Sequence, residues 1–274
     1  MKAKSVLLHL DSRVLRVLVS KENGLFSLPS LELENTTLLS PRENSQTQML
    51  VVQRAALYDN LIWADISSIP CFKGSDGAVV CEAIGKLWNL EDNSVVELPD
   101  FICKKNFNYE SITFYGGSFN PWHEGHDECL KKCPSSNIVI VPDSSPWKKN
   151  TFNKCYFKEF MSLCFRLKET PYSIFPGFFG LEQSNPTSCW ITGVTAQRIS
   201  FLMGDDNFKS IFSWKEPRVF LNALSDIYIL SRNYKTSELE DVAKEVTSFN
   251  SNLSIHYLGD HEFMEMSSTK LRDK

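Results

Sequence analysis

Residues 115–126, with the sequence YGGSFNPWHEGH, decide the fold class of this chain. A β-rich run at residues 111–115 leads into the pair Gly116 and Gly117, and a helical pattern begins at His123. Glycines at the end of a strand allow positive φ angles and let a phosphate approach the backbone N–H groups. The stretch therefore predicts a phosphate-binding turn between a strand and a helix.

The two histidines of this stretch, His123 and His126, lie three residues apart on the first turn of the expected helix. This spacing puts both imidazoles on one face, at the helix end where the dipole favours anions. Such imidazoles can donate hydrogen bonds to a phosphate as its charge redistributes, without a covalent step. A histidine pair alone is usually an ordinary surface or core feature, but here it coincides with the glycines and with Asn120 and Pro121. We therefore expect phosphoryl-group chemistry at this junction.

Strand and helix patterns alternate through the second part of the chain. The expected strands are residues 111–115, 137–141, 199–203, 226–230 and 253–257. The expected helices are residues 124–133, 154–167, 217–224 and 237–249, the last with a capping box formed by Ser237 and Glu240. This alternation predicts an α/β fold, a Rossmann-like doubly wound parallel sheet with helices on both faces. In such a sheet, ligands bind at the carboxyl ends of the strands.

The first part of the chain is different, because its apolar runs are short. They predict strands at residues 5–10, 14–20, 24–28, 61–66 and 78–84, with one helix at 46–58. The polar stretch at residues 91–108 is the best candidate for a linker. We therefore expect a small α+β accessory domain over residues 1–105 and a catalytic domain over residues 110–274.

The charge and the apolar runs restrict the partners. The 274 residues include 29 Lys and Arg against 33 Asp and Glu, which gives a net charge of −4 and no electrostatic case for a nucleic-acid partner. The run at residues 5–10 is too short for a membrane span and lacks a signal-peptide cleavage site. We therefore expect a cytoplasmic protein with no nucleic-acid or membrane partner; a homo-oligomer is compatible with the sequence.

The eight cysteines are scattered and contain no C-x-x-C pair. This pattern predicts reduced, mostly buried thiols. Cys129 and Cys133 lie four residues apart near His126, so zinc is an alternative, but no second pair at ligand spacing accompanies them. We expect packing residues here and no metal held by side chains.

The sequence GGSFNPWHEGH closely resembles the signature of the nicotinate/nicotinamide mononucleotide adenylyltransferases, within the His-x-Gly-His nucleotidylyltransferase superfamily. Further matches follow in the order of that family. They are VPDSSPWK at 141–148, FLMGDD at 201–206 with Trp214 after it, IYILSR at 227–232, and MSSTKLR at 266–272. The resemblance covers about residues 110–274.

This resemblance implies transfer of the adenylyl group of ATP to nicotinate mononucleotide or nicotinamide mononucleotide, with release of pyrophosphate, in NAD biosynthesis. Mg²⁺ would be carried mainly by the ATP phosphates. The implied catalytic residues are His123, His126, Lys148 and Arg272. The implied ATP-binding residues are Gly116, Gly117, Ser118, Phe119, Gly125, Gly204, Asp205, Ser267, Ser268 and Thr269. The implied substrate-binding residues are Asn120, Thr187, Trp214 and Arg232.

Several of these residues have a specific implied role. Lys148 would neutralise phosphate charge, and Asp205 would face the ribose or the metal-bound phosphates. Trp214 would stack on the pyridine ring, although an ordinary core position is an equal alternative for a tryptophan. The Ser267–Arg272 segment also has a meaning without the resemblance, since Ser and Thr cap a helix and leave N–H groups free for an anion. Together with the histidine turn, this segment would clamp one triphosphate from two sides.

Some alternatives remain open at this point. In the segment NPTSCWI at residues 185–191, only Thr187 matches the family's pyridine-binding helix, so the preference for the acid or the amide is open. Another transferase of the superfamily, acting on pantetheine phosphate or a cytidylyl acceptor, and a silent nucleotide-binding regulator are the alternatives to the adenylyltransferase.

The N-terminal segment LFSLPSLELE at residues 25–34 resembles the opening of a Nudix hydrolase box. Residues 44–58, where a carboxylate pair would hold Mg²⁺, contain no Asp or Glu. A Nudix-like domain here would therefore have no hydrolase activity, and an unrelated accessory domain is the alternative.

Overall fold

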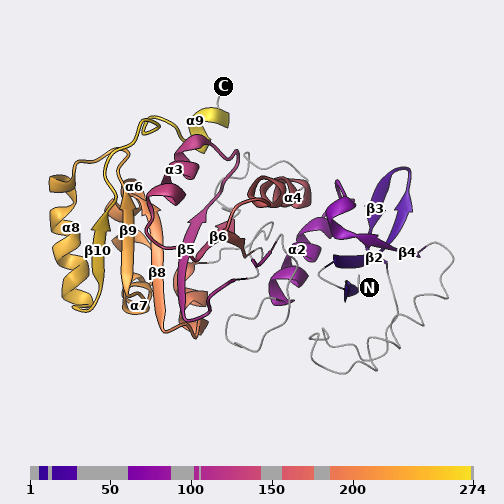
Figure 1. Ribbon diagram of the computed structural model, residues 1–274, viewed down its shortest axis with the longest axis horizontal. Coiled ribbons are helices and arrows are strands. Elements are labelled where there is room, and N and C mark those ends of the chain that lie inside the picture. Colours follow the sequence, from indigo (N-terminus) through magenta and orange to yellow (C-terminus); the bar gives the residue numbers. More distant parts are fainter. Residues whose placement is uncertain are drawn as a thin grey trace.

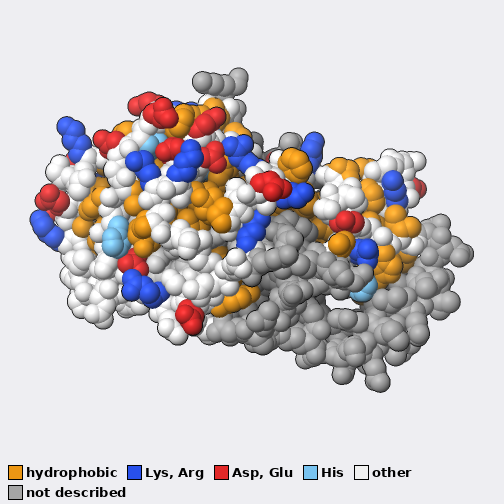
Figure 2. Space-filling view, in the orientation of Figure 1, with side chains coloured by type: hydrophobic (Ala, Val, Ile, Leu, Met, Phe, Trp, Pro, Cys, Tyr) orange, Lys and Arg blue, Asp and Glu red, His pale blue; other side chains and the backbone are white. Residues whose placement is uncertain are grey.

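The computed structural model describes residues 6–11, 14–29, 61–87, 102–104, 106–142, 156–175 and 186–272. These residues form a large sheet and a small sheet, which lie side by side in Figure 1. Within the described ranges, we find no helix whose length and apolarity would let it cross a membrane. Basic and acidic side chains are intermixed over the face shown in Figure 2, as the nearly balanced composition predicts.

The large sheet has six parallel strands in the order β10-β9-β8-β5-β6-β7. The strands are β5 (Ser111–Gly117), β6 (Ile138–Pro142), β7 (Ser173–Ile174), β8 (Arg198–Gly204), β9 (Asp226–Leu230) and β10 (Ser254–Tyr257). Every residue of β6 is buried, as expected for a parallel sheet that is covered on both faces. The predicted Rossmann-like sheet is thus confirmed, with β7 as a strand that the sequence did not predict.

Helices connect and flank these strands. They are α3 (Glu124–Lys132), α4 (Tyr156–Leu167), α5 (Thr187–Trp190), η2 (Ile191–Gly193), α6 (Asp205–Lys209), η3 (Ile211–Ser213), α7 (Pro217–Asn222), α8 (Thr236–Phe249) and α9 (Ser268–Arg272). The predicted capping box of α8 is wrong. Because the helix begins at Thr236, it is the Glu238 carboxylate that accepts the N–H of Lys235, at 2.8 Å.

The small sheet is antiparallel, and its central strand pairs with three others. The strands are β1 (Leu8–Asp11), β2 (Val14–Glu22), β3 (Leu25–Ser27) and β4 (Leu61–Asp65), and β2 is the one that contacts all the rest. The short η1 (Ile66–Ser68) and the helix α2 (Asp76–Leu87) follow. The segments on which the Nudix comparison depends, residues 30–34 and 44–58, lie outside the described residues.

The strand predicted at residues 78–84 is instead the middle of α2. Its run of small and β-branched apolar residues gives no helical periodicity, because the helix is covered on more than one side. Val80, Cys81 and Ile84 are fully buried. Asp76, also fully buried, accepts the N–H of Leu28 at 2.9 Å and ties the start of α2 to the small sheet.

Helix α2 joins the two sheets by packing on α4, and both helices lie between the sheets in Figure 1. The rings of Phe72 and Phe157 meet edge to face with centroids 4.9 Å apart. One continuous cluster of buried apolar side chains extends from the small sheet to the large one. The domain boundaries at residues 105 and 110 therefore stay a prediction.

The cysteines depart from the expectation at one position. Cys81, Cys103, Cys129, Cys133, Cys164 and Cys189 are free, and all except Cys189 are buried. Cys71, in contrast, is disulfide-bonded. The expectation of reduced thiols is wrong for this residue, because disulfide formation depends on which segments the fold brings together and not on spacing in the sequence.

Candidate active site

A cavity of about 1080 Å³ opens at the carboxyl ends of the central strands of the large sheet. Gly116 and Gly117 at the end of β5, Val141 in β6, and Met203 and Gly204 at the end of β8 contribute to its wall. This is the edge at which an open parallel sheet is expected to bind ligands. The cavity therefore locates the candidate site at the turn that the sequence singled out.

The two glycines are needed for close packing and not for positive φ angles. A Cβ atom on Gly116 would lie 3.2 Å from the ring of Phe201, and one on Gly117 would lie 3.1 Å from the ring of Phe119. The positive φ angle of the turn belongs to Phe119, at 47°, which corrects the expectation for the glycines. A non-glycine residue in this region costs about 1–3 kcal/mol, and the buried ring of Phe119, packed on Tyr115 and Trp122, offsets that cost.

Asn120 and Pro121, joined by a cis peptide bond, anchor the turn to other parts of the chain. The Asn120 side-chain amide donates to Glu159 of α4 at 3.0 Å. Asn120 is not among the residues that line the cavity, and its predicted substrate-binding role stays a prediction. The carbonyl of Pro121 accepts from the Ser268 hydroxyl at 2.9 Å. The turn is thus fixed from α4 on one side and from α9 on the other.

His123 and His126 are stacked on each other at the cavity wall. Their ring centroids lie 3.7 Å apart with an angle of 26° between the planes. His123 is the N-cap residue of α3 and has an extended backbone, with φ at −148°. A Cβ atom on Gly125 would lie 3.0 Å from the ring of His123. Glycine between the histidines therefore leaves room for this ring to fold over the first turn.

The hydrogen bonds fix the tautomer of His126. The backbone N–H of His123 donates to Nδ1 of His126 at 3.2 Å, so a neutral ring carries its proton on Nε2. Burial is the main cause that lowers the pKa of His123 to about 4 and the pKa of His126 to about 2, with Arg232 also lowering both. At neutral pH both rings are therefore uncharged and serve as hydrogen-bonding groups.

His123 is buried, yet neither of its ring nitrogens has a hydrogen-bond partner among the described residues. A buried polar atom left without a partner costs about 1–3 kcal/mol, so such atoms are rare away from functional sites. Both nitrogens belong to a side chain at the cavity wall. Unsatisfied polar atoms on a side chain beside the cavity make His123 a candidate for ligand contact.

Arg232 and Asp205 lie close together but have different roles. Arg232 lines the cavity, and its guanidinium donates to the carbonyl of Met266 at 2.7 Å. Asp205 is fully buried, and its Oδ2 accepts the backbone N–H groups of Arg232, Asn233 and Tyr234 at 2.7, 2.7 and 2.8 Å. The predicted contact of Asp205 with a ribose or with phosphates stays a prediction, since Oδ1 has no partner among the described residues. This carboxylate holds the loop that carries Arg232.

The C-terminal helix supplies the other side of the cavity. Ser267 and Ser268 line the cavity, and the Ser267 hydroxyl accepts the N–H of Lys270 at 3.1 Å, as expected for a helix cap. Thr269 and Arg272 lie on α9, but their side chains are outside the described part of the structure. Lys148 is also outside it, within residues 143–155.

The remaining predicted substrate residues, Thr187 and Trp214, line the cavity. The Trp214 ring packs on Phe201 and Phe220, with centroids 6.3 and 5.2 Å away. Sequence reasoning missed other lining residues, among them Asn207, Lys215, Met264, Glu265 and Lys270. Lys215 follows Trp214 directly, and Lys270 is within the Ser267–Arg272 segment, so adjacency to a predicted residue was the available signal.

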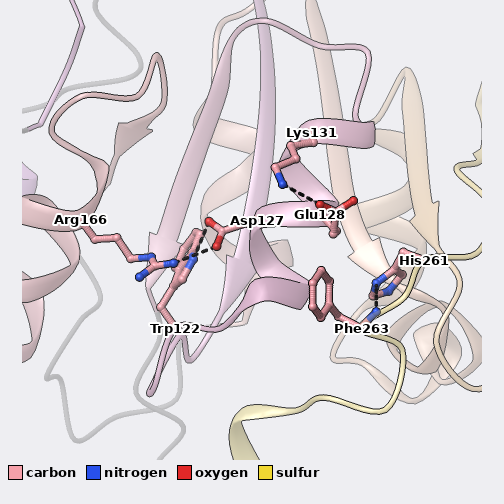
Figure 3. A network of polar contacts seen from close by, with 7 residues as sticks. All are labelled: Trp122, Asp127, Glu128, Lys131, Arg166, His261 and Phe263. Atoms are coloured by element: carbon pink, nitrogen blue, oxygen red, sulfur yellow. Dashed lines mark hydrogen bonds and ion pairs between the residues drawn. The ribbon is translucent and has the colours of Figure 1, made fainter.

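Figure 3 shows the contacts on the two sides of α3. On one side, Asp127 is held by Trp122 and Arg166. On the other, Lys131 donates to Glu128 at 2.7 Å, and His261 accepts the N–H of Phe263 at 3.2 Å. The helix that begins with the histidines is therefore tied to α4 through Arg166, whereas the other two bonds lie within α3 and within the C-terminal segment.

Comparison with known proteins agrees with this arrangement. Residues 114–274 match the sequence profile of the family described as Cytidylyltransferase-like. A protein of Fusobacterium nucleatum named "Probable nicotinate-nucleotide adenylyltransferase" is 24% identical over 175 residues, which are 60% of this chain and 86% of that protein. A protein of Caldicellulosiruptor bescii with the same name is 25% identical over 176 residues, which are 59% of this chain and 84% of that protein.

Proposed function

The chain belongs to the cytidylyltransferase-like family, and we propose that it transfers the adenylyl group of ATP to nicotinate mononucleotide or nicotinamide mononucleotide. The names of the two relatives support this reaction. The observation that carries the proposal is the pair of stacked, uncharged histidines that line the cavity, together with the two buried nitrogens of His123 that have no partner among the described residues. The glycines at the ends of β5 and β8 and the side chain of Arg232 line the same cavity.

In the proposed reaction, an oxygen of the mononucleotide phosphate attacks the α-phosphorus of ATP. A new bond forms between this oxygen and the α-phosphorus, and the bond from the α-phosphorus to the bridging β-phosphate oxygen breaks. Pyrophosphate leaves with the electron pair of the broken bond. No bond to the protein forms, so the protein contributes by positioning the phosphates and by stabilising their charge.

The side chains of the cavity divide this work. The proton on Nε2 of His126 gives a donor for phosphate oxygens, and Arg232 supplies a positive charge from the end of β9. Ser267 and Ser268 approach from α9. Lys148 and Arg272, whose side chains lie outside the described residues, are proposed to add further positive charge, as the resemblance implies.

In this proposal the metal ion reaches the cavity on the substrate. Among the described residues, no group of three or more His, Cys, Asp and Glu side chains is placed to hold a metal ion. Burial raises the pKa of the Cys129 thiol to about 12, which disfavours the thiolate that zinc requires. Mg²⁺ bound to the triphosphate would neutralise part of its charge.

Two residues bear on the choice of acceptor. Trp214 presents an aromatic ring for stacking on a pyridine ring, and Lys215 beside it lines the cavity. A positive side chain near the ring site would attract the carboxylate of nicotinate mononucleotide more than the amide of nicotinamide mononucleotide. The acid is therefore the preferred acceptor in this proposal.

Pyrophosphate release tests the proposal. The protein is incubated with ATP, Mg²⁺ and each mononucleotide separately, with ATP alone as the background. We expect turnover with at least one acceptor and a higher kcat/KM for nicotinate mononucleotide. Lys215→Met should reduce this preference, by roughly 10-fold, mainly through the rate with the acid. Absence of turnover with both acceptors would overturn the proposed reaction.

A further inference from the structure

Helix α4 contacts different parts of the molecule with its two faces. Phe157 meets Phe72, and a Cβ atom on Gly77 of α2 would lie 2.7 Å from the Cβ of Phe157, so the two helices are in direct contact. Glu159 and Arg166 lie two helical turns apart and therefore share the opposite face. That face contacts the histidine turn. Helix α4 thus connects the N-terminal part of the chain to the candidate site.

The contact from Arg166 runs through one carboxylate. Nη2 of Arg166 donates to Oδ2 of Asp127 at 2.8 Å, and Nε1 of Trp122 donates to Oδ1 of the same group at 2.9 Å. The guanidinium also lies 5.9 Å from the centre of a Trp122 ring. Figure 3 shows Arg166 reaching from α4 to both residues. The two oxygens of Asp127 therefore fix Trp122 relative to α4.

Trp122 in turn contacts the ring of His126. The centroids of these rings are 5.1 Å apart, and the stacked ring of His123 also contacts His126. Glu159 holds Asn120, two residues before Trp122, at 3.0 Å. Burial is the main cause of the lowered pKa of His126, and the Arg166 charge contributes to it. The position of His126 depends on these contacts as well as on its own helix.

The ion pair itself has little value for stability. The side chains of Arg166 and Asp127 are 49% and 34% exposed, and ion pairs exposed to this degree stabilise a fold only weakly. Their geometry is nevertheless specific, since both carboxylate oxygens are used and the guanidinium lies near an indole ring. Such specific geometry in a weakly stabilising ion pair suits residues that hold a neighbouring side chain, here Trp122, in place.

We propose that α4 positions His126 for catalysis through Arg166, Asp127 and Trp122, with α2 fixing α4 from its opposite face. Arg166 and Asp127 are positioning residues in this proposal. The kinetic consequence rests on the proposed adenylyl transfer, but the position of the His126 ring does not. The two are therefore measured separately.

The first measurement is a histidine NMR spectrum. The chain has five histidines, so the ¹H–¹³C signals of the imidazoles can be assigned by single substitutions. In Arg166→Gln, we expect the His126 signals to shift. Arg166→Lys keeps a charge for Asp127 but not the planar group near Trp122, so it should restore the signals only in part. Asp127→Asn should shift the same signals.

The second measurement is steady-state kinetics of the same variants. We expect Arg166→Gln to lower kcat by about 10-fold with KM values within about 2-fold, because a displaced His126 affects the transition state more than ground-state binding. If the wild-type protein turns over neither mononucleotide, the proposed function fails, and the NMR result still decides the positioning.

Arg198→Gln is the matched control. Arg198 forms an ion pair of similar length, 2.7 Å, with Asp226, and it is far from the histidine turn along β8. Asp226 also contacts His256 at 3.0 Å. This control should shift the His256 signals and leave both His126 and kcat unchanged, whereas Arg166→Gln should leave His256 unchanged.

Gly77→Ala tests the contribution of α2, because the added Cβ forces α2 and α4 apart at Phe157. We expect the His126 signals to shift, although the substituted residue lies on α2 and not at the site. Unchanged His126 signals in both Arg166→Gln and Asp127→Asn would overturn the proposal, and so would a lower kcat without such a shift. Unchanged His126 signals in a folded Gly77→Ala protein would overturn the part that involves α2.

Discussion

Two buried aspartates lie at opposite ends of the large sheet, and each accepts three hydrogen bonds. Asp205, at the carboxyl end of β8, binds three consecutive backbone N–H groups with one oxygen. Asp226, at the amino end of β9, binds the side chains of Arg198, Ser200 and His256 with both oxygens. Although burial disfavours its charge, the bonds from His256, Arg198 and Ser200 hold the pKa of Asp226 below its usual value.

The difference between the two ends lies in what remains unpaired. Both oxygens of Asp226 are used, so its cluster is complete. At the carboxyl end, Oδ1 of Asp205 and both ring nitrogens of His123 are buried without a partner in the described part of the chain. The end of the sheet that leaves polar groups unsatisfied is also the end with the cavity. Completeness of hydrogen bonding therefore separates the structural end of the sheet from the end that carries the candidate site.

The largest expected effect is that of His126→Ala. Loss of a preorganised donor to the phosphates should lower the rate of pyrophosphate release by about 10³-fold while the protein stays folded. The matched change at the other end, His256→Ala, should leave the rate within about 2-fold. Rates of pyrophosphate release, with far-ultraviolet circular dichroism to verify folding, measure both. Equal losses of rate in the two variants would contradict the proposed difference between the two ends of the sheet.

The second effect concerns stability. Asp205→Ala leaves three backbone N–H groups without an acceptor and should lower the free energy of unfolding by about 3 kcal/mol. Asp226→Ala should cost less, about 1–2 kcal/mol, because its partners Arg198 and His256 are largely exposed and can bind water instead. Urea unfolding monitored by fluorescence measures both values. A larger loss of unfolding free energy for Asp226→Ala would contradict the role of Asp205 in holding the loop that carries Arg232.

A third, smaller effect is expected for Gly125→Ala. The added Cβ would lie 3.0 Å from the ring of His123, so the ring has to move by a few tenths of an ångström. We expect kcat to fall by about 10-fold with little loss of stability. Steady-state kinetics and urea unfolding test this together. A kcat equal to that of the wild-type protein would mean that the position of the His123 ring is not critical.

The smallest effect is a pH dependence of stability that belongs to the cavity end. Burial lowers the pKa of His123 to about 4, against about 6.5 in an unfolded chain. Between these values the unfolded chain binds more protons, so stability falls as the pH falls. His123→Gln should therefore reduce the slope of unfolding free energy against pH, by up to about 1.4 kcal/mol per pH unit. Urea unfolding at pH 7, 6 and 5 measures this slope. An unchanged slope would mean that a group other than His123 causes the pH dependence.

Most of the large sheet was predictable because its strands and helices have clear periods. Residues 226–230 form β9 as predicted, and the helix predicted at 124–133 is α3. The two-residue β7 was not predictable, since its pairing with β6 depends on the neighbouring strand and not on a pattern of its own. The residues of α2 predict a strand because burial on several sides of the helix removes the helical period.

The sequence predicts where the candidate site lies better than it predicts which side chains contact one another there. The strand–turn–helix junction, Trp214 and the Ser267–Arg272 segment do surround one cavity, as far as their side chains are described. The direction of a side chain was not predictable from spacing. Asp205 and Asp206 are neighbours, and yet Asp205 points into the core while Asp206 lines the cavity. Asn120 likewise turns to Glu159, which the sequence places 39 residues away.

The hydrogen bond from Ser268 to the carbonyl of Pro121 joins residues that are 147 positions apart. During synthesis, the histidine turn leaves the ribosome long before its partner in α9 exists. All six strands of the large sheet precede residue 268, since β10 ends at Tyr257. The cavity wall that α9 provides is therefore made after every strand of the sheet that carries the histidine turn. The sheet can pair its strands before the site has its second wall.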